Sequence, residues 1–346
     1  MRICIMGAGS LGTILGAYLN KGGLPVDLVD ANQEHVDALN TKGARVIGKS
    51  EFTVPVHALT PDKMEGIYDL VIYMVKQTFN DIALKQLLPH LGPDSVVLTL
   101  QNGMPELAVS EYVGKERTIG GMVGWGATWI GPGVSECTSP ETKREFNIGE
   151  LDGAITPRLL EIQKILSLMC HTEVTSNLMG GRWYKLHTNA ALSGMSAVCG
   201  CTFGELLQDP RAFRCVQLVG NETIQVAYAS GVTLDVVAGF DKNPLAFKDE
   251  EGLESTREIY LKRWGNSLLK ASMLQDLEKG KRCEVDGIDG VVAKVGRQVG
   301  IPTPVTDQVI AIIKGCEDGK YRPSMQNLDL FDPEIFTTPY HFSTAG

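Results

Sequence analysis

The chain has 346 residues, which is long for a single hydrophobic core, so we expect two domains. With 43% hydrophobic and 21% charged residues it has the composition of an ordinary globular protein. A net charge of −9 argues against a nucleic-acid partner, which would need a basic face, and no apolar stretch is long enough to predict a membrane span.

The first half of the chain alternates short β-branched runs with helical segments. Apolar strands separated by helices are typical of a parallel sheet covered on both faces. Between residues 120 and 151 the chain turns polar and glycine-rich, which predicts antiparallel strands at the edge of that sheet. The predicted strands are 3–6, 26–29, 70–74 and 96–100, and the predicted helices are 11–20, 33–39 and 155–169.

After about residue 172 the apolar residues recur at helical spacing. The predicted helices are 177–198, 210–230, 253–277, 284–299 and 305–315. The last 25 residues have little periodicity and predict a tail that lies on the surface or is disordered. We therefore predict an α/β domain over residues 1–172, an all-α domain over 173–320 and a tail over 321–346.

A glycine-rich turn follows the first predicted strand. Gly7-Ala8-Gly9-Ser10-Leu11-Gly12 is a G-x-G-x-x-G sequence between a strand and a helix. In that context the first glycine permits a tight turn, the second lets a pyrophosphate approach, and the third lets the helix pack on the strand. The helix N-terminus then favours phosphate. The pattern predicts a Rossmann-type, doubly wound dinucleotide-binding domain.

Asp30 ends the second predicted strand, 21 residues after Gly9. A carboxylate there accepts hydrogen bonds from the adenosine ribose hydroxyls. It would repel a 2′-phosphate, and its neighbours Ala31 and Asn32 bring no positive charge. NAD(H) is therefore the expected cofactor, with NADP(H) left open, and a solvated turn aspartate is the alternative reading of Asp30.

The first helix of the second half carries a polar stripe. At 100° per residue, Lys185, Asn189 and Ser193 fall within about 80° of one another. Apolar neighbours would half-bury Lys185, lower its pKa and make it a usable proton donor. The alternative is a lysine that snorkels at a domain interface. His187 points about 200° away and is expected to be satisfied or exposed.

Further polar candidates lie outside that helix. Asn102 and Lys76 each follow a predicted strand, at the sheet edge where ligands of such folds bind. Ser272 and Glu284 belong to two polar clusters separated by Gly280, and by themselves these clusters are better interpreted as helix caps and surface charges.

The eight cysteines are scattered, and only Cys199 and Cys201 lie close in the chain. Their spacing matches neither a redox nor a zinc pattern, so no metal site is predicted. The start of the chain has no signal-peptide pattern. Together these features predict a cytoplasmic protein.

Taken together, the motifs resemble the ketopantoate reductase (2-dehydropantoate 2-reductase) family over roughly residues 1–305. The matching sequences are the glycine turn, Val75-Lys76, Gln101-Asn102-Gly103, Lys185-Leu186-x-x-Asn189, Ser272-Met273-Leu274-Gln275-Asp276 and Glu284-Val285-Asp286. The resemblance implies a helical C-terminal domain of the 6-phosphogluconate dehydrogenase type and a place in pantothenate biosynthesis. It also leaves a homodimer open.

The resemblance implies a role for each matched residue. Lys185 would be the general acid that protonates the keto oxygen, with Glu284 its charged partner near the ribose and substrate. Asn102 would contact the nicotinamide side and the substrate, and Lys76 would lie near the cofactor. Ser272 would bind the substrate carboxylate, while Asn189 and its neighbour Ser193 would face the substrate's oxygens.

Three positions depart from the family pattern. Ser193 stands where the family usually has a second asparagine, and Leu269 where it often has another. The segment between Lys185 and Ser272 is longer than usual, through residues 241–264. We therefore expect a retained catalytic core with an altered substrate wall.

The expected function is reduction of a 2-oxo acid, ketopantoate or a relative, to the 2-hydroxy acid. Two alternatives stay open at this point: a dehydrogenase that oxidises a different hydroxy acid or an imine with NAD, and a non-catalytic dinucleotide-binding sensor. The retained polar residues argue against the sensor, which would need the glycine turn alone.

Overall fold

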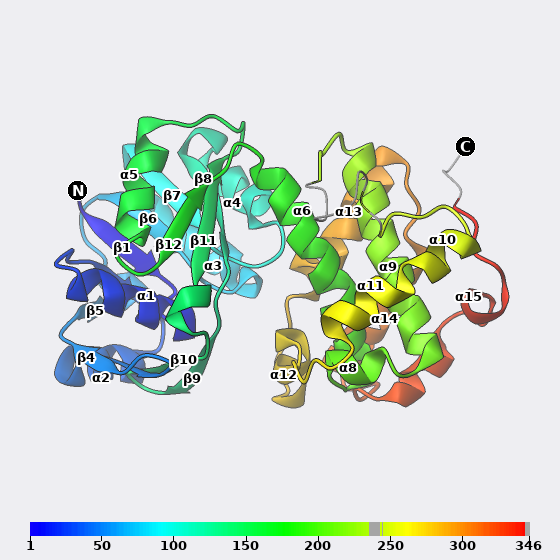
Figure 1. Ribbon diagram of the computed structural model, residues 1–346. Coiled ribbons are helices and arrows are strands. Elements are labelled where there is room, and N and C mark those ends of the chain that lie inside the picture. The colour runs from blue at the N-terminus through cyan, green and yellow to red at the C-terminus, as the bar shows by residue number, and fades with distance from the viewer. Residues whose placement is uncertain (235–242, 244, 343–346) are drawn as a thin grey trace. The chain divides into compact units, whose positions relative to one another are not determined.

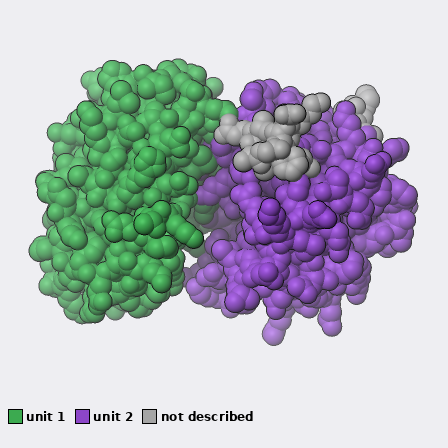
Figure 2. All heavy atoms as spheres, in the orientation of Figure 1, with its two compact units in different colours: residues 1–178 green, residues 179–346 purple. Residues whose placement is uncertain are grey.

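The computed structural model describes residues 1–234, 243 and 245–342 (Figure 1). The chain divides into two compact units, Met1–Leu178 and Met179–Gly346, coloured separately in Figure 2. Residues 241, 242 and 244 of the predicted insertion lie outside the described residues, as does the end of the tail from 343 on. In the described parts of the chain, no helix is long and apolar enough to cross a membrane.

An eight-stranded sheet forms the centre of the first unit, in the order β12-β11-β8-β7-β6-β1-β2-β5. Neighbouring strands run parallel, apart from the antiparallel pair β8 and β11. The strands are β1 Ile3–Met6, β2 Asp27–Val29, β5 His57–Leu59, β6 Tyr68–Tyr73, β7 Leu91–Thr99, β8 Thr118–Val123, β11 Glu145–Glu150 and β12 His171–Val174. This sheet confirms the predicted fold class.

Helices cover both faces of the sheet because successive strand residues point to opposite sides. Ile3 and Ile5 of β1 belong to one apolar core, with α1 and α5, while Cys4 and Met6 belong to the other, with α3 and α4. The helices are α1 Ser10–Lys21, α2 Gln33–Lys42, α3 Asn80–Leu87, α4 Pro105–Val113 and α5 Pro157–Leu166. Short 3-10 turns, η1 to η5, lie at Pro61–Lys63, Gln77–Phe79, Leu88–His90, Lys115–Arg117 and Glu141–Lys143.

A second, four-stranded sheet has the order β4-β3-β10-β9. Its strands are β3 Ala44–Gly48, β4 Phe52–Val54, β9 Ala127–Gly131 and β10 Val134–Cys137. The prediction that residues 120–151 extend the main sheet is correct for β8 and β11 and wrong for β9 and β10. Those two strands leave the main sheet because β10 pairs in parallel with β3, a strand that the sequence pattern did not reveal.

Among the described residues of the second unit, the regular elements are helices, and one isolated bridge joins Asp249 and His341. Its longest helix, α9, begins at Pro210 and is capped by the Asp209 carboxylate, which accepts from two backbone N–H groups. The elements are α6 Leu178–Thr188, a π-helix η6 Asn189–Gly194, α7 Met195–Cys199, α8 Phe203–Leu206, α9 Pro210–Ala229, α10 Glu250–Ser255, α11 Arg257–Trp264, α12 Ser272–Glu278, η7 Val285–Gly287, α13 Asp289–Val299, α14 Pro304–Glu317, η8 Met325–Leu330 and α15 Glu334–Thr337.

The long helix predicted at 253–277 is wrong, because the chain leaves helical geometry between α11 and α12. In that stretch the carbonyls of Ser267 and Leu269 accept hydrogen bonds from Gly204 N (2.8 Å) and Phe203 N (3.0 Å). These are N–H groups at the start of α8, which have no partner inside that helix. The non-helical stretch therefore completes the N-terminus of another helix.

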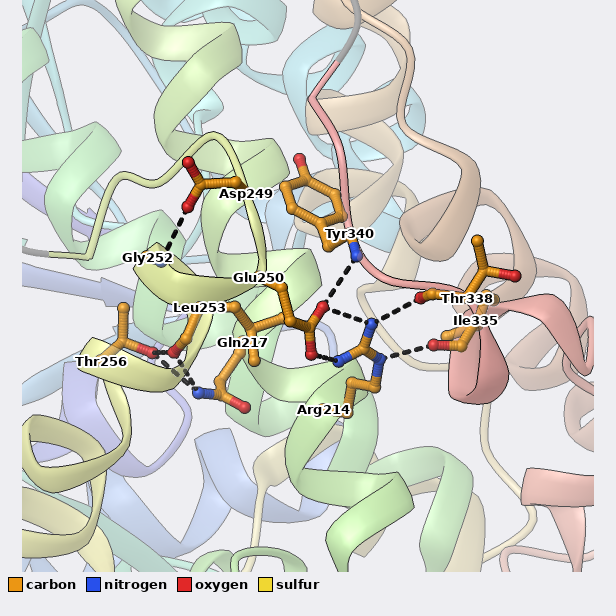
Figure 3. A network of polar contacts seen from close by, with 10 residues as sticks. All are labelled: Arg214, Gln217, Asp249, Glu250, Gly252, Leu253, Thr256, Ile335, Thr338 and Tyr340. Atoms are coloured by element: carbon orange, nitrogen blue, oxygen red, sulfur yellow. Dashed lines mark hydrogen bonds and ion pairs between the residues drawn. The ribbon is translucent and has the colours of Figure 1, made fainter.

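The predicted tail packs on α9 and α10 as far as residue 342. Arg214 of α9 is the centre of the contact, shown in Figure 3. Its guanidinium donates to both carboxylate oxygens of Glu250, at 2.6 and 2.9 Å, and to the carbonyls of Ile335 and Thr338. Glu250 also accepts from Tyr340 N at 2.7 Å. A bidentate ion pair thus joins α9 to α10, and its two side chains also hold the tail through backbone groups of Ile335, Thr338 and Tyr340.

Candidate active site

The glycine turn has the close contacts that its motif requires. Gly7 has a φ of +95°, and a Cβ there would lie 2.5 Å from the backbone nitrogen of Val75. A Cβ on Gly12 would lie 2.3 Å from Gly7 O. The turn is also anchored to β2, because Gly7 N and Ala8 N both donate to Val29 O, at 2.8 and 3.0 Å. Larger residues would therefore push the turn away from the sheet.

A cavity of about 420 Å³ opens beside this turn, at the carboxyl ends of β1, β2 and β6. Of the predicted cofactor residues, Gly7, Gly9, Asp30 and Lys76 line it together. A Cβ on Gly9 would meet nothing within 4 Å, so the turn leaves open space there. Ser10, Leu11 and Gly12 form the first turn of α1 behind the loop. Gly9, the N-cap of α1, is part of the lining, so the cavity reaches a helix N-terminus, where phosphate groups are favoured.

Asp30 stands at the end of β2, on the wall of the cavity. Its Oδ1 accepts a hydrogen bond from Asn32 N at 2.9 Å, and its own N–H donates to Leu59 O of β5. The carboxylate is therefore held in place by the turn that follows it. Such a group suits ribose hydroxyls, which donate to it.

Exposed apolar side chains form another wall of the cavity, which the sequence patterns did not single out. Phe79 is 57% exposed and Ile82 is 62% exposed, and both line the cavity with Pro61 and Ala83. Large apolar groups left open to solvent beside a cavity are suited to a flat ligand such as a base. The sequence holds no signal for them, because their spacing matches that of any amphipathic helix.

Lys76 and Asn102 follow β6 and β7, which are neighbours in the sheet. Their loops are tied together, because the Gln77 side chain donates to Asn102 O at 2.6 Å. The Gln101 side chain donates in turn to Val75 O and to the side chain of Asn80. Lys76 is exposed and lines the cavity, whereas Asn102 lies half-buried outside its lining.

The polar residues of the second unit lie on two different kinds of helix. Lys185 is half-buried on α6, whereas Asn189 and Ser193 lie in the π-helix. The prediction of one α-helix over 177–198 is therefore wrong in that segment, and the 100° stripe does not hold beyond Thr188. A π-helix has a wider turn and is often found at functional sites. Within the π-helix Gly194 lies against Asp289 of α13 and Val309 of α14, where a Cβ would lie 2.6 Å from Asp289 Oδ1.

Ser272 and Glu284 complete the predicted set. Ser272 is the exposed first residue of α12, a helix that contacts the π-helix. Glu284 is half-buried and directly precedes η7. Leu269 has an exposed side chain. In the described residues, no group of His, Cys, Asp or Glu side chains is arranged to hold a metal ion.

A doubly wound sheet with this glycine turn, followed by a helical unit, defines a nicotinamide-dependent oxidoreductase. The family models for "Ketopantoate reductase PanE/ApbA" and its C-terminal part match residues 3–153 and 177–317. The chain belongs to the ketopantoate reductase family.

Individual relatives agree with that assignment along nearly their whole length. A 2-dehydropantoate 2-reductase of Pyrococcus horikoshii is 29% identical, over 92% of this chain and 98% of the relative. The solved ketopantoate reductase of Ralstonia eutropha JMP134 has a TM-score of 0.78 at 26% identity, over 92% of this chain and 99% of its own. D-mandelate dehydrogenase, solved with NADH and anilino(oxo)acetate, shares the fold, with a TM-score of 0.78 at 23% identity and coverage of 92% and 99%.

Proposed function

We propose that this protein reduces the keto group of a 2-oxo acid to the 2-hydroxy acid. The observation that carries the proposal is the cavity beside the glycine turn, lined by Asp30, in a chain whose two units both match the ketopantoate reductase family. The nicotinamide cofactor, when bound, supplies the hydride.

We assign the proton transfer to Lys185. As the carbonyl carbon gains the hydride, the π electrons of the C=O bond move to the oxygen, and that oxygen takes a proton from the Lys185 ammonium group. The lysine, left neutral, regains a proton from water. Glu284 is assigned as the charged partner that keeps this ammonium oriented. A half-buried position on α6 supports the role, because it limits the water that competes for the proton.

The remaining residues are assigned to binding. Ser272 would donate its hydroxyl to the substrate carboxylate, and Asn189 with Ser193 would bind the substrate's other oxygens. Asn102 would contact the nicotinamide side of the site, and Lys76 would lie near the cofactor phosphates. The position of Lys76 on the cavity wall supports the last assignment.

NAD(H) is the cofactor that we expect the enzyme to prefer. The support is the Asp30 carboxylate at the end of β2, followed by Ala31 on the same cavity wall and Asn32, neither of which carries a positive charge. A 2′-phosphate placed against a carboxylate is repelled, whereas two ribose hydroxyls are bound by it. NADP(H) would be used less efficiently.

Ketopantoate should be turned over without being the best substrate. The support is the pair Ser193 and Leu269, which replace two family asparagines. An asparagine amide offers two donors and an acceptor, while leucine offers none. A hydroxylated oxo acid would lose about 1–3 kcal/mol of binding for each unmet group. Larger, more apolar 2-oxo acids would then be favoured.

A homodimer in the cytoplasm completes the proposal. A dimeric ketopantoate reductase from Staphylococcus aureus has this fold, with a TM-score of 0.72 at 15% identity. The eight free thiols are compatible with a reducing compartment. Light scattering on the purified protein measures the assembly directly.

A turnover screen tests the function. Absorbance at 340 nm would be followed with a panel of 2-oxo acids and either NADH or NADPH, and with 2-hydroxy acids and NAD or NADP. We expect oxidation of NADH by several 2-oxo acids. Turnover confined to a hydroxy acid or an imine with NAD would indicate the oxidative alternative. Cofactor binding with no turnover in any mixture would indicate a sensor.

A further inference from the structure

Two buried side chains contact the carbonyl oxygen of Ala8, inside the glycine turn. Thr13 Oγ1 donates to it at 2.7 Å, and His35 Nε2 lies 2.8 Å from the same oxygen. Ala8, Thr13 and His35 are all completely buried. Water therefore does not compete for either contact, and the orientation of this peptide depends on the two side chains.

The tautomer of His35 follows from its other nitrogen. Gly133 N donates a hydrogen bond to His35 Nδ1 at 2.9 Å, so Nδ1 must be the unprotonated acceptor. The hydrogen of the neutral ring then sits on Nε2, which lies 2.8 Å from Ala8 O and 3.1 Å from Thr13 Oγ1, so that Ala8 O is the nearer acceptor. Burial lowers the pKa of His35, which agrees with a neutral ring, although the Asp30 carboxylate opposes that shift.

His35 also joins three parts of the first unit. Gly133 lies in the turn between β9 and β10, and its carbonyl accepts from Arg45 N of β3 at 2.9 Å. The Trp129 ring of β9 packs on the imidazole at 4.5 Å between centroids. On the other side, His35 N donates to Asn32 Oδ1, in the turn that also holds Asp30. The His35 ring thus connects the second sheet to the glycine turn.

The held carbonyl sets the direction of the next N–H group. The described backbone has no cis peptide bond, and in a trans peptide the C=O and N–H point in opposite directions. Because Ala8 O points toward His35 and Thr13, Gly9 N–H points away from these two side chains. Gly9 lines the cavity, and a Cβ added to it would meet nothing within 4 Å.

We propose that His35 is a positioning residue for the cofactor: its Nε2–H holds the Ala8–Gly9 peptide so that Gly9 N–H faces the pyrophosphate of the dinucleotide. The proposal rests on the nicotinamide cofactor alone and is independent of the substrate. No residue of the second sheet lines the cavity. The sheet still contributes to cofactor binding, because Gly133 N–H fixes the His35 tautomer that carries this donor.

Two substitutions distinguish the role of Nε2 from the role of Nδ1. In His35→Gln the amide reaches the position of Nε2 and keeps a donor for Ala8 O. In His35→Asn the shorter amide reaches the position of Nδ1 and keeps only the acceptor for Gly133 N. His57→Asn is the matched control, because His57 is an exposed histidine on β5 that contacts Asp27 and lies outside the cavity lining.

The dissociation constant is measured without substrate, by fluorescence titration with whichever of NADH and NADPH binds the wild type more tightly. We expect His35→Asn to weaken binding about tenfold, as one lost hydrogen bond would. His35→Gln should change it less than about threefold, and His57→Asn should leave it unchanged. If His35→Asn does not fold, Thr13→Val removes the other donor to the same carbonyl and should weaken binding by a similar factor.

Equal losses of cofactor affinity in His35→Gln and His35→Asn would overturn the proposal, because the ring would then matter only for packing. So would unchanged affinity in His35→Asn, or in the Thr13→Val variant that replaces it. In turnover assays the KM for the cofactor should rise while kcat is kept, and the reverse would also contradict a positioning role. Since the binding assay needs no substrate, a protein that turns over no 2-oxo acid would refute the proposed reaction and still test His35.

Discussion

His187 Nε2 and the hydroxyl of Tyr260 lie 2.8 Å apart in the interior of the helical unit. His187 is on α6, two residues after Lys185, and Tyr260 is on α11, within residues 241–264. Arg263 of α11 also donates to the hydroxyl of Tyr184 on α6. Burial and the Arg263 charge lower the pKa of His187 to about 4, so the ring is neutral near pH 7. The described part of residues 241–264 therefore packs on the helix that carries Lys185.

Tyr260→Phe should lower the free energy of unfolding by about 1–3 kcal/mol, because a buried imidazole nitrogen is left without its partner. Chemical denaturation measures it. Tyr228→Phe, at an exposed tyrosine of α9, is the control and should have little effect. Equal stability of Tyr260→Phe and the wild type would mean that the contact is neutral.

The buried carboxyl group of Asp289 should make the free energy of unfolding depend on pH. It is fully buried at the start of α13, and neither carboxylate oxygen has a hydrogen-bond partner among the described residues. Desolvation raises the pKa of this carboxyl well above its ordinary value. The folded state therefore holds the proton more tightly than the unfolded chain. Stability is lost as pH rises above the unfolded value near 3.8, by up to about 1.4 kcal/mol per pH unit.

Asp289→Asn removes that ionisation, so its stability relative to the wild type should increase as pH rises above the ordinary aspartate range. Denaturant unfolding at four pH values measures the difference. Asp286→Asn, at an exposed carboxylate in the same segment, is the control. Parallel stability curves for Asp289→Asn and the wild type would show that the buried carboxyl has no such role.

Asp30 should set the choice between the two nicotinamide cofactors. With the best 2-oxo acid, we expect kcat/KM to favour NADH by at least about tenfold, which corresponds to 1.4 kcal/mol. Asp30→Ala should narrow the ratio, mainly by improving NADPH, because the repulsive charge is gone. Asp37→Ala, an exposed carboxylate on α2, should not change it. An equal or better kcat/KM with NADPH in the wild type would refute the preference.

Lys185→Ala should lose most of kcat while the protein folds and binds cofactor as before. General acid catalysis typically contributes about 10²–10⁴-fold. Lys262→Ala, at an exposed lysine of α11, is the control. A Lys185→Ala variant that keeps kcat within about threefold, when chemistry limits the rate, would identify an interface lysine instead.

Ser272→Ala should act through KM for the 2-oxo acid rather than through kcat. Its hydroxyl is assigned to the substrate carboxylate, which carries the same charge in the ground state and in the transition state. Steady-state kinetics over a range of substrate concentrations separates the two constants. Ser255→Ala, on α10, is the control. A loss confined to kcat would place Ser272 nearer to the reacting carbonyl.

The sequence alone predicted the fold class, a doubly wound sheet followed by helices, and it predicted the glycine turn beside which the cavity opens. A strand, three spaced glycines and a helix are a local pattern, and the contacts of Gly7 and Gly12 follow from the missing Cβ atoms. The same holds for Asp30, which the length of one βαβ unit brings to the end of β2. Periodicity also identified the helical unit, since apolar spacing needs no distant partner.

The tertiary structure alone decided the features that depend on residues far apart in the chain. His35 contacts Gly133 across 98 positions, and that contact selects its tautomer. The second sheet exists because β10 pairs with β3. The π-helix that carries Asn189 and Ser193 packs against α9 and α14, with Gly194 against Asp289. No local pattern encodes these pairings, because each depends on side chains that folding brings together from distant parts of the chain.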